Sequence, residues 1–227
     1  MKSYYFLFSL FLFASCSTYK GIPVDYNVQE IGRLAYLKPY VTLSLIKEGN
    51  VGIKDDSLSK ESEMILSNFY LNNSAMFRLS ESIGYSDSTD IMILKKAINT
   101  LIYNMEVSKR KDTVGIPVDL SRILTKSKND YIMLSIISGF KRTDKNYTNQ
   151  SLKGAGIGLL TLGSYIQSPY RYGTSTYFIV LDNVKNKILC YRKSNLIDKD
   201  PTSPKVIENQ FRQLIQAFWT KDFSLVD

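Results

Sequence analysis

The segment Tyr131–Ile137 (YIMLSII) constrains the fold of this chain most, because it is apolar at almost every position. A strand with one solvated face alternates apolar and polar residues, so an unbroken apolar run indicates a central strand buried on both faces. Such a strand needs helices above and below its sheet, which favours the α/β class. A second segment, Tyr40–Ile46 (YVTLSLI), has a similar sequence, and we expect the two strands to lie side by side in one sheet.

A β-hairpin is predicted later in the chain. Its first strand is Ser175–Leu181, its turn is Asp182–Asn186, and its second strand is Lys187–Lys193. Two runs of β-forming residues around a short polar turn are typical of a hairpin. With the earlier strands, this hairpin predicts a single α/β (α+β) domain, whose mixed four- to five-stranded sheet is covered by helices.

Two helices are predicted around the strand at 40–46. The first is Glu30–Leu37, which ends before Pro39. The second is Ser57–Met76, with Ser59 as its candidate N-cap. Both have apolar residues at helical spacing, so each is expected to bury one side.

Three further helices are predicted from the second half of the chain. Asp90–Val107 gives the clearest helical pattern, although its opening, Ile91–Leu94, is equally compatible with a short buried strand. Asp119 can cap a short helix, and Pro204 lies in the first turn of a final amphipathic helix with Ser203 as its cap. The short helix carries Leu120, Ile123 and Leu124.

The first sixteen residues have the pattern of an export leader. Lys2 gives a basic start, Phe6–Phe13 is almost wholly apolar, and Ala14-Ser15-Cys16 follows. The apolar run is shorter than the roughly 20 residues that span a bilayer, and it has the length of a signal-peptide core, about 7 to 15 residues. The pattern resembles the lipobox of bacterial lipoproteins, which implies that Cys16 is lipidated and becomes the first residue of the mature chain.

This resemblance implies three parts: residues 1–15 as signal peptide, 16–29 as a lipidated tether, and 30–227 as an α/β periplasmic domain. A plain secretory signal, with Cys16 incidental, and an uncleaved N-terminal anchor are the alternatives. Several acyl chains such as palmitate would hold the protein on a membrane, since each buried methylene contributes about 0.8 kcal/mol. Bacteroidetes lipoproteins exported to the cell surface carry an acidic cluster just after the cysteine. Residues 17–20 of this chain (STYK) contain no acidic pair and do not resemble that signal. We therefore expect the inner leaflet of the outer membrane, facing the periplasm.

Composition excludes several kinds of chemistry. The chain has no histidine, which rules out histidine-based catalytic triads and histidine metal sites. It has two cysteines, and with Cys16 lipidated Cys190 has no partner for an internal disulfide. The apolar neighbours of Cys190 indicate a buried, inert thiol. The sequence therefore predicts no metal and no cofactor.

The formal net charge is +8, and it is +7 without Lys2 (28 basic minus 21 acidic residues). Such a balance is compatible with nucleic acid, anionic lipid or an acidic polymer as partner. In an exported protein nucleic acid is disfavoured, and the scattered lysines indicate a solvated basic surface. The expected partners are the membrane, through the lipid anchor, and other envelope proteins, with a homo-oligomer as one option.

Glycines recur in the segment 154–163 (GAGIGLLTLG). A nucleotide-binding loop is not favoured, because no strand leads directly into it and the spacing fits neither the dinucleotide fingerprint nor a phosphate loop. An apolar, glycine-spaced segment packs closely against a partner or a membrane surface, and the alternative is a flexible linker between two strands. The candidate interaction residues are Gly154, Gly156, Gly158, Leu159, Leu160 and Gly163.

Three triplets, DSL at 56–58, DST at 87–89 and DTV at 112–114, resemble the O-glycosylation pattern of Bacteroidetes envelope proteins. Their candidate acceptors are Ser57, Ser88 and Thr113. All three are expected in loops or at helix starts, where a glycan has room.

The part of the chain from Tyr131 to the final helix resembles a group of bacterial envelope lipoproteins. The residues Val180-Leu181-Asp182 and Lys187-Ile188-Leu189 match a hairpin that reads roughly LVD-x-x-TGE-IL, with Lys185-Asn186 in place of Thr-Gly. Asparagine supports a positive φ nearly as well as glycine, so the turn is preserved. This hairpin is similar to that of the curli-secretion-channel (CsgG-like) and penicillin-binding-protein-activator (LpoB-like) lipoproteins, whose α/β fold is shared with the TolB N-terminal domain.

The resemblance implies a periplasmic domain that acts in protein–protein assembly and is not an enzyme. A second hypothesis is an enzyme that acts on cell-wall glycan or lipid through carboxylates or tyrosine, which the absence of histidine disfavours. A third is a passive ligand-binding lipoprotein that uses the aromatic residues of the late segment. The resemblance leaves open whether this chain forms a pore. A pore would need long alternating strands in this part of the chain, and Leu159-Leu160 and the nearby glycines do not alternate cleanly.

Overall fold

The computed structural model describes residues 26–84, 88–109, 113–161 and 168–221 of the chain. These residues form one α/β domain with a mixed seven-stranded sheet, which confirms the predicted fold class. The elements in chain order are β1 (Leu34–Leu37), β2 (Tyr40–Ile46), β3 (Ile53–Lys54), α1 (Asp56–Asn72), β4 (Leu79–Ile83), α2 (Ser88–Val107), α3 (Val118–Leu124), β5 (Tyr131–Arg142), α4 (Asp144–Leu160), β6 (Tyr172–Asp182), β7 (Lys187–Ile197) and α5 (Pro204–Thr220).

Strand β5 is the centre of the sheet. Along one edge it pairs antiparallel with β6, and β6 pairs antiparallel with β7 to form the predicted hairpin. Along the other edge it pairs in parallel first with β1 and then with β2, which follow one another. The two strands of similar sequence, β2 and β5, therefore lie side by side as predicted, with Tyr40 opposite Ile136. The outer strands are β7, beside β6, β4, beside β1, and β3, beside β2.

The segment Glu30–Leu37, for which the sequence predicts a helix, contains strand β1 instead. All four residues of β1 are buried, and Ala35 lies opposite Ile132 of β5. The apolar spacing of this segment fits a helix as well as a short buried strand, so local sequence does not decide between them. The position between β5 and β4 decides, because a strand there has hydrogen-bonding neighbours on both sides. Proline at position 39 then separates β1 from β2.

The sheet has more strands than the four or five predicted. The additional strands are short: β1 has four residues, β3 two and β4 five. Strand β5 is longer than predicted, since it continues beyond Ile137 to Arg142 through the more polar residues 138–142 (SGFKR). Short and polar strands carry little periodic signal, and they form here because a neighbouring strand offers a hydrogen-bonding edge.

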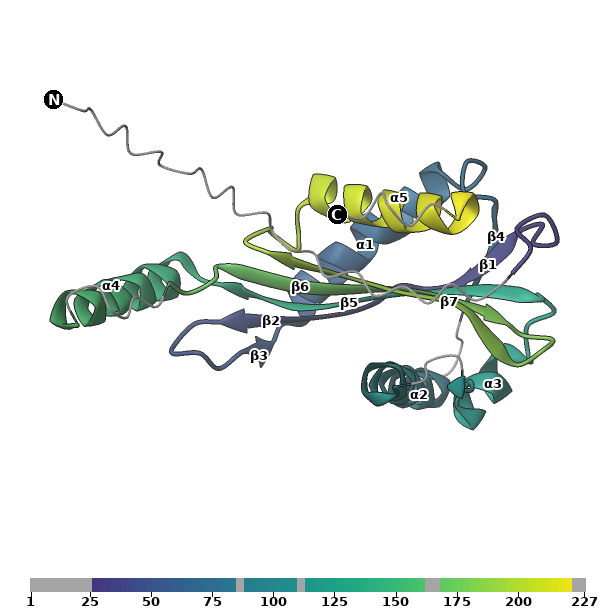
Figure 1. Ribbon diagram of the computed structural model, residues 1–227, viewed down its shortest axis with the longest axis horizontal. Helices are drawn as coiled ribbons and strands as arrows, with labels where there is room; N and C mark the ends of the chain where they lie inside the picture. Colours follow the sequence, from purple (N-terminus) through teal and green to yellow (C-terminus); the bar gives the residue numbers. More distant parts are fainter. Residues whose placement is uncertain (1–25, 85–87, 110–112, 162–167, 222–227) are drawn as a thin grey trace, which may run out of the picture.

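Helices cover both faces of the sheet (Figure 1). On one face α1 and α5 pack over a core that includes Leu66, Phe211 and Met133. On the other face α2 and α3 pack over a second core that includes Leu101 and Leu134. Strand β5 contributes side chains to both cores, as expected for a strand without apolar–polar alternation.

Helix α1 is capped by Asp55, so the prediction of Ser59 as the cap is wrong. The Asp55 side chain accepts a hydrogen bond from the Leu58 N–H at 3.0 Å. Ser59 lies one turn further along, buried, where its Oγ accepts from the Leu43 N–H at 2.9 Å and ties α1 to β2. Both residue types are good caps, and the helix begins at the first one because β3 ends at Lys54.

The helical pattern at Asp90–Val107 is confirmed by α2. The strand alternative at Ile91–Leu94 is wrong, since Met92 is 67% exposed and Leu94 is 5% exposed, which is the one-sided burial of a helix. Asp119 lies in the first turn of α3, but the N-cap position belongs to Pro117. The leucine and isoleucine side chains predicted for this helix are buried. Helix α5 begins at Pro204 as predicted.

Candidate functional site: helix α4, its root and its tip

Helix α4 extends beyond the end of the sheet (Figure 1). Thr143 caps it, accepting a hydrogen bond from the Asn146 N–H at 3.2 Å, and Asp144 in the first turn complements the helix dipole. The flexible-linker alternative for the glycine-rich segment is therefore wrong for residues 154–160. Each of the three glycines inside this helix costs about 0.5–1 kcal/mol relative to alanine. The helix therefore depends on the contacts at its base.

Arg142 holds the base of α4. Its guanidinium Nε donates to the Tyr170 carbonyl at 2.8 Å, and its Nη2 donates to Asn50 Oδ1 at 2.9 Å. Its Nη1 donates to the Gly49 carbonyl at 3.0 Å and to Asn146 Oδ1 at 2.8 Å. These five residues, which we call the α4 root, join the end of β5, the β2–β3 loop, the first turn of α4 and the segment that enters β6.

The root needs a glycine at position 49 because of its backbone conformation. Its φ of +55° lies in the left-handed region, which directs its carbonyl toward the helix. That carbonyl also accepts from Asn146 Nδ2 at 3.1 Å, while Asn146 itself is buried. The β2–β3 loop and α4 are thereby fixed to one another through the buried side chains of Arg142 and Asn146.

A second clamp fixes the first turns of α4 to β6. The guanidinium carbon of Arg171 lies 5.8 Å from the ring centre of Tyr147 on α4 and 5.4 Å from that of Tyr172 on β6. Arg171 also forms an ion pair with Asp144. Cation–π contacts of this kind contribute about 0.5–1 kcal/mol each at exposed sites. The Arg171 contacts thus add to those of the root, to which Arg171 is joined because its carbonyl accepts from the Arg142 N–H at 2.9 Å.

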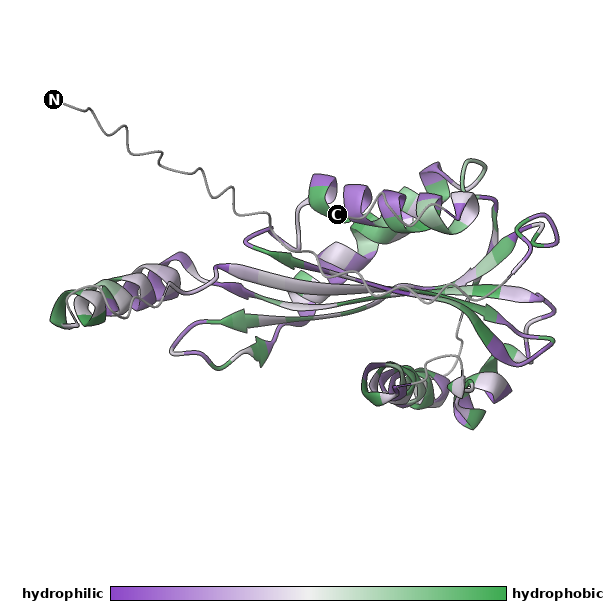
Figure 2. Cartoon of the chain, in the orientation of Figure 1, coloured by the Kyte–Doolittle hydropathy of each residue, from purple (hydrophilic) through white to green (hydrophobic). Residues whose placement is uncertain are grey.

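The far end of α4 exposes apolar side chains. Leu159 is 81% exposed, Leu160 is 88% exposed and Ile157 is 40% exposed. We call these three residues the α4 tip. In Figure 2 the hydrophobic colour gathers at this free end, whereas the part of α4 next to the sheet is hydrophilic. No helix in the described part of the chain has the length and apolar content needed to cross a membrane.

The structure places five of the six predicted interaction residues on α4. Gly154 and Gly158 are buried, and Gly156 is half-buried with open space where a Cβ would lie. Leu159 and Leu160 belong to the tip. Gly163 lies outside the described residues, so its contribution stays a prediction.

The other predicted modification sites lie at helix starts, between two helices, or outside the described residues. Cys16 lies outside them. Ser57 is an exposed residue in the first turn of α1, Ser88 is the first residue of α2, and Thr113 is exposed between α2 and α3. Glycosylation at these three residues stays a prediction, which the intact mass of the native protein would test.

Cys190 is buried, as predicted. Burial raises the pKa of its thiol to about 11, and the nearby Arg192 guanidinium offsets only part of this effect. A thiol with so high a pKa is almost entirely protonated at neutral pH and is a poor nucleophile.

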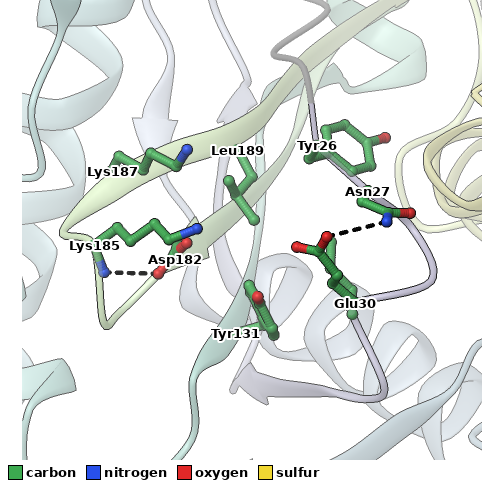
Figure 3. A pocket seen from close by; sticks show the side chains of 9 residues that line it. Tyr26, Asn27, Glu30, Tyr131, Asp182, Lys185, Lys187 and Leu189 are labelled. Carbon is green, nitrogen blue, oxygen red and sulfur yellow. Dashed lines mark hydrogen bonds between the residues drawn. The ribbon is translucent and has the colours of Figure 1, made fainter.

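A hollow of about 260 Å³ lies at the opposite end of β5 from α4 (Figure 3). Its charged residues bring both signs: Lys185 and Lys187 from the hairpin, and Glu30 and Asp182. The carboxylates already have partners, because Glu30 Oε1 accepts from Asn27 Nδ2 at 3.1 Å and Asp182 Oδ1 accepts from the Lys185 N–H at 2.7 Å. The balanced charges and these internal hydrogen bonds indicate structural roles.

Glu106, Tyr191 and Lys193 form a cluster of titratable side chains between α2 and β7. Tyr191 donates to Glu106 Oε1, and Lys193 Nζ lies 3.1 Å from Glu106 Oε2. Burial and then Glu106 raise the pKa of Tyr191. The pKa of Lys193 is also raised, because its bonds to Glu106 and Tyr177 outweigh the lowering effect of burial. The phenol and the ammonium therefore keep their protons near neutral pH, and the cluster ties α2 to β7.

Sequence reasoning missed Arg142, the residue that organises this site. It lies at the end of β5, beyond the predicted strand, and no sequence motif marks it. Within the described ranges, no group of three or more histidine, cysteine, aspartate or glutamate side chains is placed to hold a metal ion.

Comparison with known proteins gives only structural similarities. No protein-family model matches this sequence, and no curated protein sequence matches it. Among solved structures, the PelC dodecamer from Paraburkholderia phytofirmans is similar at 7% identity and a TM-score of 0.36, covering 85% of this chain and 90% of that chain.

Two further similar structures come from other proteins. The LpoB C-terminal domain from Escherichia coli is 12% identical with a TM-score of 0.30, covering 74% of this chain and 91% of that one. A DUF4136 family protein from Bacteroides thetaiotaomicron is 7% identical with a TM-score of 0.35, covering 89% of this chain and 96% of that one. At these identities and scores, function has to be argued from this chain's own residues.

Proposed function

We propose that this protein is a non-enzymatic, lipid-anchored cell-envelope protein that assembles with other envelope proteins in the periplasm. In this proposal Cys16 carries the lipid, residues 16–29 form the tether, and the α4 tip is the contact surface. The observation that carries the proposal is the combination of a fixed root and an exposed apolar tip on one helix.

An apolar tip of this kind is unfavourable in an isolated molecule. Leu159 and Leu160 each leave most of their side chain in water, and burying a leucine side chain contributes about 1.5–3 kcal/mol. The root, built on the buried Arg142 and Asn146 side chains, meanwhile keeps α4 in one orientation before any partner arrives. A contact element that is already ordered binds without a further ordering cost.

The test is crosslinking in native envelopes that carry the full-length protein. The variant Leu159→Glu/Leu160→Glu places two charges at the tip, and we expect it to lose the crosslinked species that the unchanged protein forms. The matched control is Met64→Glu/Leu71→Glu on α1, whose side chains are 51% and 64% exposed, and which should keep those species. If the tip variant crosslinks as the unchanged protein does, the α4 tip is not the contact surface.

A further inference from the structure

A hollow of about 360 Å³ lies beside the α4 root, and the described residues that line it include two cations and no carboxylate. The cations are Arg142 and Lys153. Asn50 of the β2–β3 loop and Tyr170 of the segment entering β6 also line it, as does Ile157 of the α4 tip. This one-sided charge differs from the balanced charges of the hollow in Figure 3.

The charge of Arg142 is not compensated by the described residues. Arg142 is only 8% exposed, and the four acceptors of its guanidinium hydrogen bonds are all neutral oxygens. Taking a cation out of water is costly unless an anion accompanies it.

Three hydrogen-bond donors remain for a ligand at this hollow. A guanidinium has five N–H groups, and within the described part of the chain Arg142 has acceptors for four of them, which leaves one N–H of Nη2. Asn50 accepts from Arg142 through Oδ1, so its Nδ2 amino group is available. Lys153 is exposed at the rim and has no ion-pair partner among the described residues.

We propose that this hollow binds a phosphate group. A guanidinium, an amide N–H and an ammonium around one cavity match an anion that accepts from several directions. Ile157 lies at the same hollow and the rest of the α4 tip follows it along the helix, so a phosphate that carries acyl chains would find apolar surface next to its charge. The proposal does not depend on the assembly role of the tip.

Two substitutions test the site without removing Arg142. Asn50→Asp keeps the shape of the side chain and its acceptor for Arg142, but it supplies the missing negative charge. We expect this variant to fold, to melt at a higher temperature than the unchanged protein, and to lose phosphate binding. Lys153→Gln should weaken binding about fivefold, because Lys153 is exposed at the rim. Lys60→Gln, an exposed lysine on α1, is the matched control and should leave binding unchanged.

The measurement is isothermal titration calorimetry of the full-length protein in nonionic detergent, at fixed ionic strength. Two probes are titrated: inorganic phosphate and the anionic lipid dihexanoyl phosphatidylglycerol. If the ligand is a lipid headgroup, the anionic lipid binds more tightly than inorganic phosphate, and if it is a free phosphate, the two bind equally well. In both cases Asn50→Asp loses binding. The proposal is overturned if no probe binds, or if Asn50→Asp binds as the unchanged protein does.

Discussion

Replacing Arg142 with methionine should loosen the attachment of α4 to the sheet while leaving the two cores intact. Methionine keeps the apolar stem of the side chain and removes the guanidinium, which donates four hydrogen bonds at the α4 root. At a net contribution of about 1 kcal/mol each, their loss amounts to roughly 4 kcal/mol. The variant also avoids burying a charge, which offsets part of this loss, so we expect a net destabilisation of about 2–3 kcal/mol.

The expected effect is local as well as global. In a domain of this size 1 kcal/mol shifts Tm by about 2–4 °C, so Tm should fall by roughly 4–12 °C. Hydrogen exchange followed by mass spectrometry should show faster exchange in α4, because its three glycines make it unstable without the root. Exchange in β5 and α5 should change little, since their side chains belong to the cores.

Arg122→Met is the matched control. Arg122 pairs with Asp119 on α3 with 62% of its side chain exposed, and surface pairs of this kind contribute about 0–1 kcal/mol. If Arg142→Met leaves α4 as protected from exchange as in the unchanged protein, the root does not hold the helix, and the orientation of the tip must have another cause.

Three further predictions follow from single residues. Cys16→Ala should move the protein from the membrane fraction to the soluble fraction on cell fractionation, and retention in the membrane would contradict lipidation. Cys190 should resist iodoacetamide at pH 8 in the native state and react once the protein is unfolded, because its pKa is raised from an ordinary value of 9.0 to about 11. Because the Cys190 pKa is higher in the folded than in the unfolded protein, this thiol contributes to the free energy of unfolding fully below pH 9. In urea-unfolding experiments that contribution should be lost as the pH rises from 9 toward 11. Rapid alkylation of the native protein at pH 8 would contradict the burial of Cys190. Gln210→Leu should cost about 1–3 kcal/mol by thermal unfolding, because the buried amide accepts from Thr176 Oγ1 and donates to Ser194 Oγ, and a loss no larger than that of exposed Gln213→Leu would refute this role.

The long elements could be predicted from the sequence because each carries its own signal. β2, the hairpin and α5 follow from β-forming runs, a polar turn and helical spacing over several turns. The pairing of β2 with β5 also follows, since two strands that are both apolar gain most when they are buried together. The four residues of β1 carry no such signal, because their apolar pattern is compatible with a buried helix and with a buried strand.

The candidate site could be predicted only in part. Leu159 and Leu160 stand out because adjacent leucines after spaced glycines are unusual in a polar stretch, and they prove to be exposed. The role of Arg142 could not be predicted, because its acceptors come from loops 28 or more residues away as well as from the next turn of chain.

The sequence by itself determined the α/β class, the central position of the apolar strand at Tyr131–Ile137, and the absence of histidine chemistry. These depend on composition and on periodicity within one segment, which a single chain displays directly. The tertiary structure alone decided that 34–37 is a strand, that the glycine-spaced segment is a helix, and that Arg142 holds that helix in place. Each of these depends on hydrogen-bond partners, either strand edges or acceptors for Arg142, that distant parts of the chain supply only after folding.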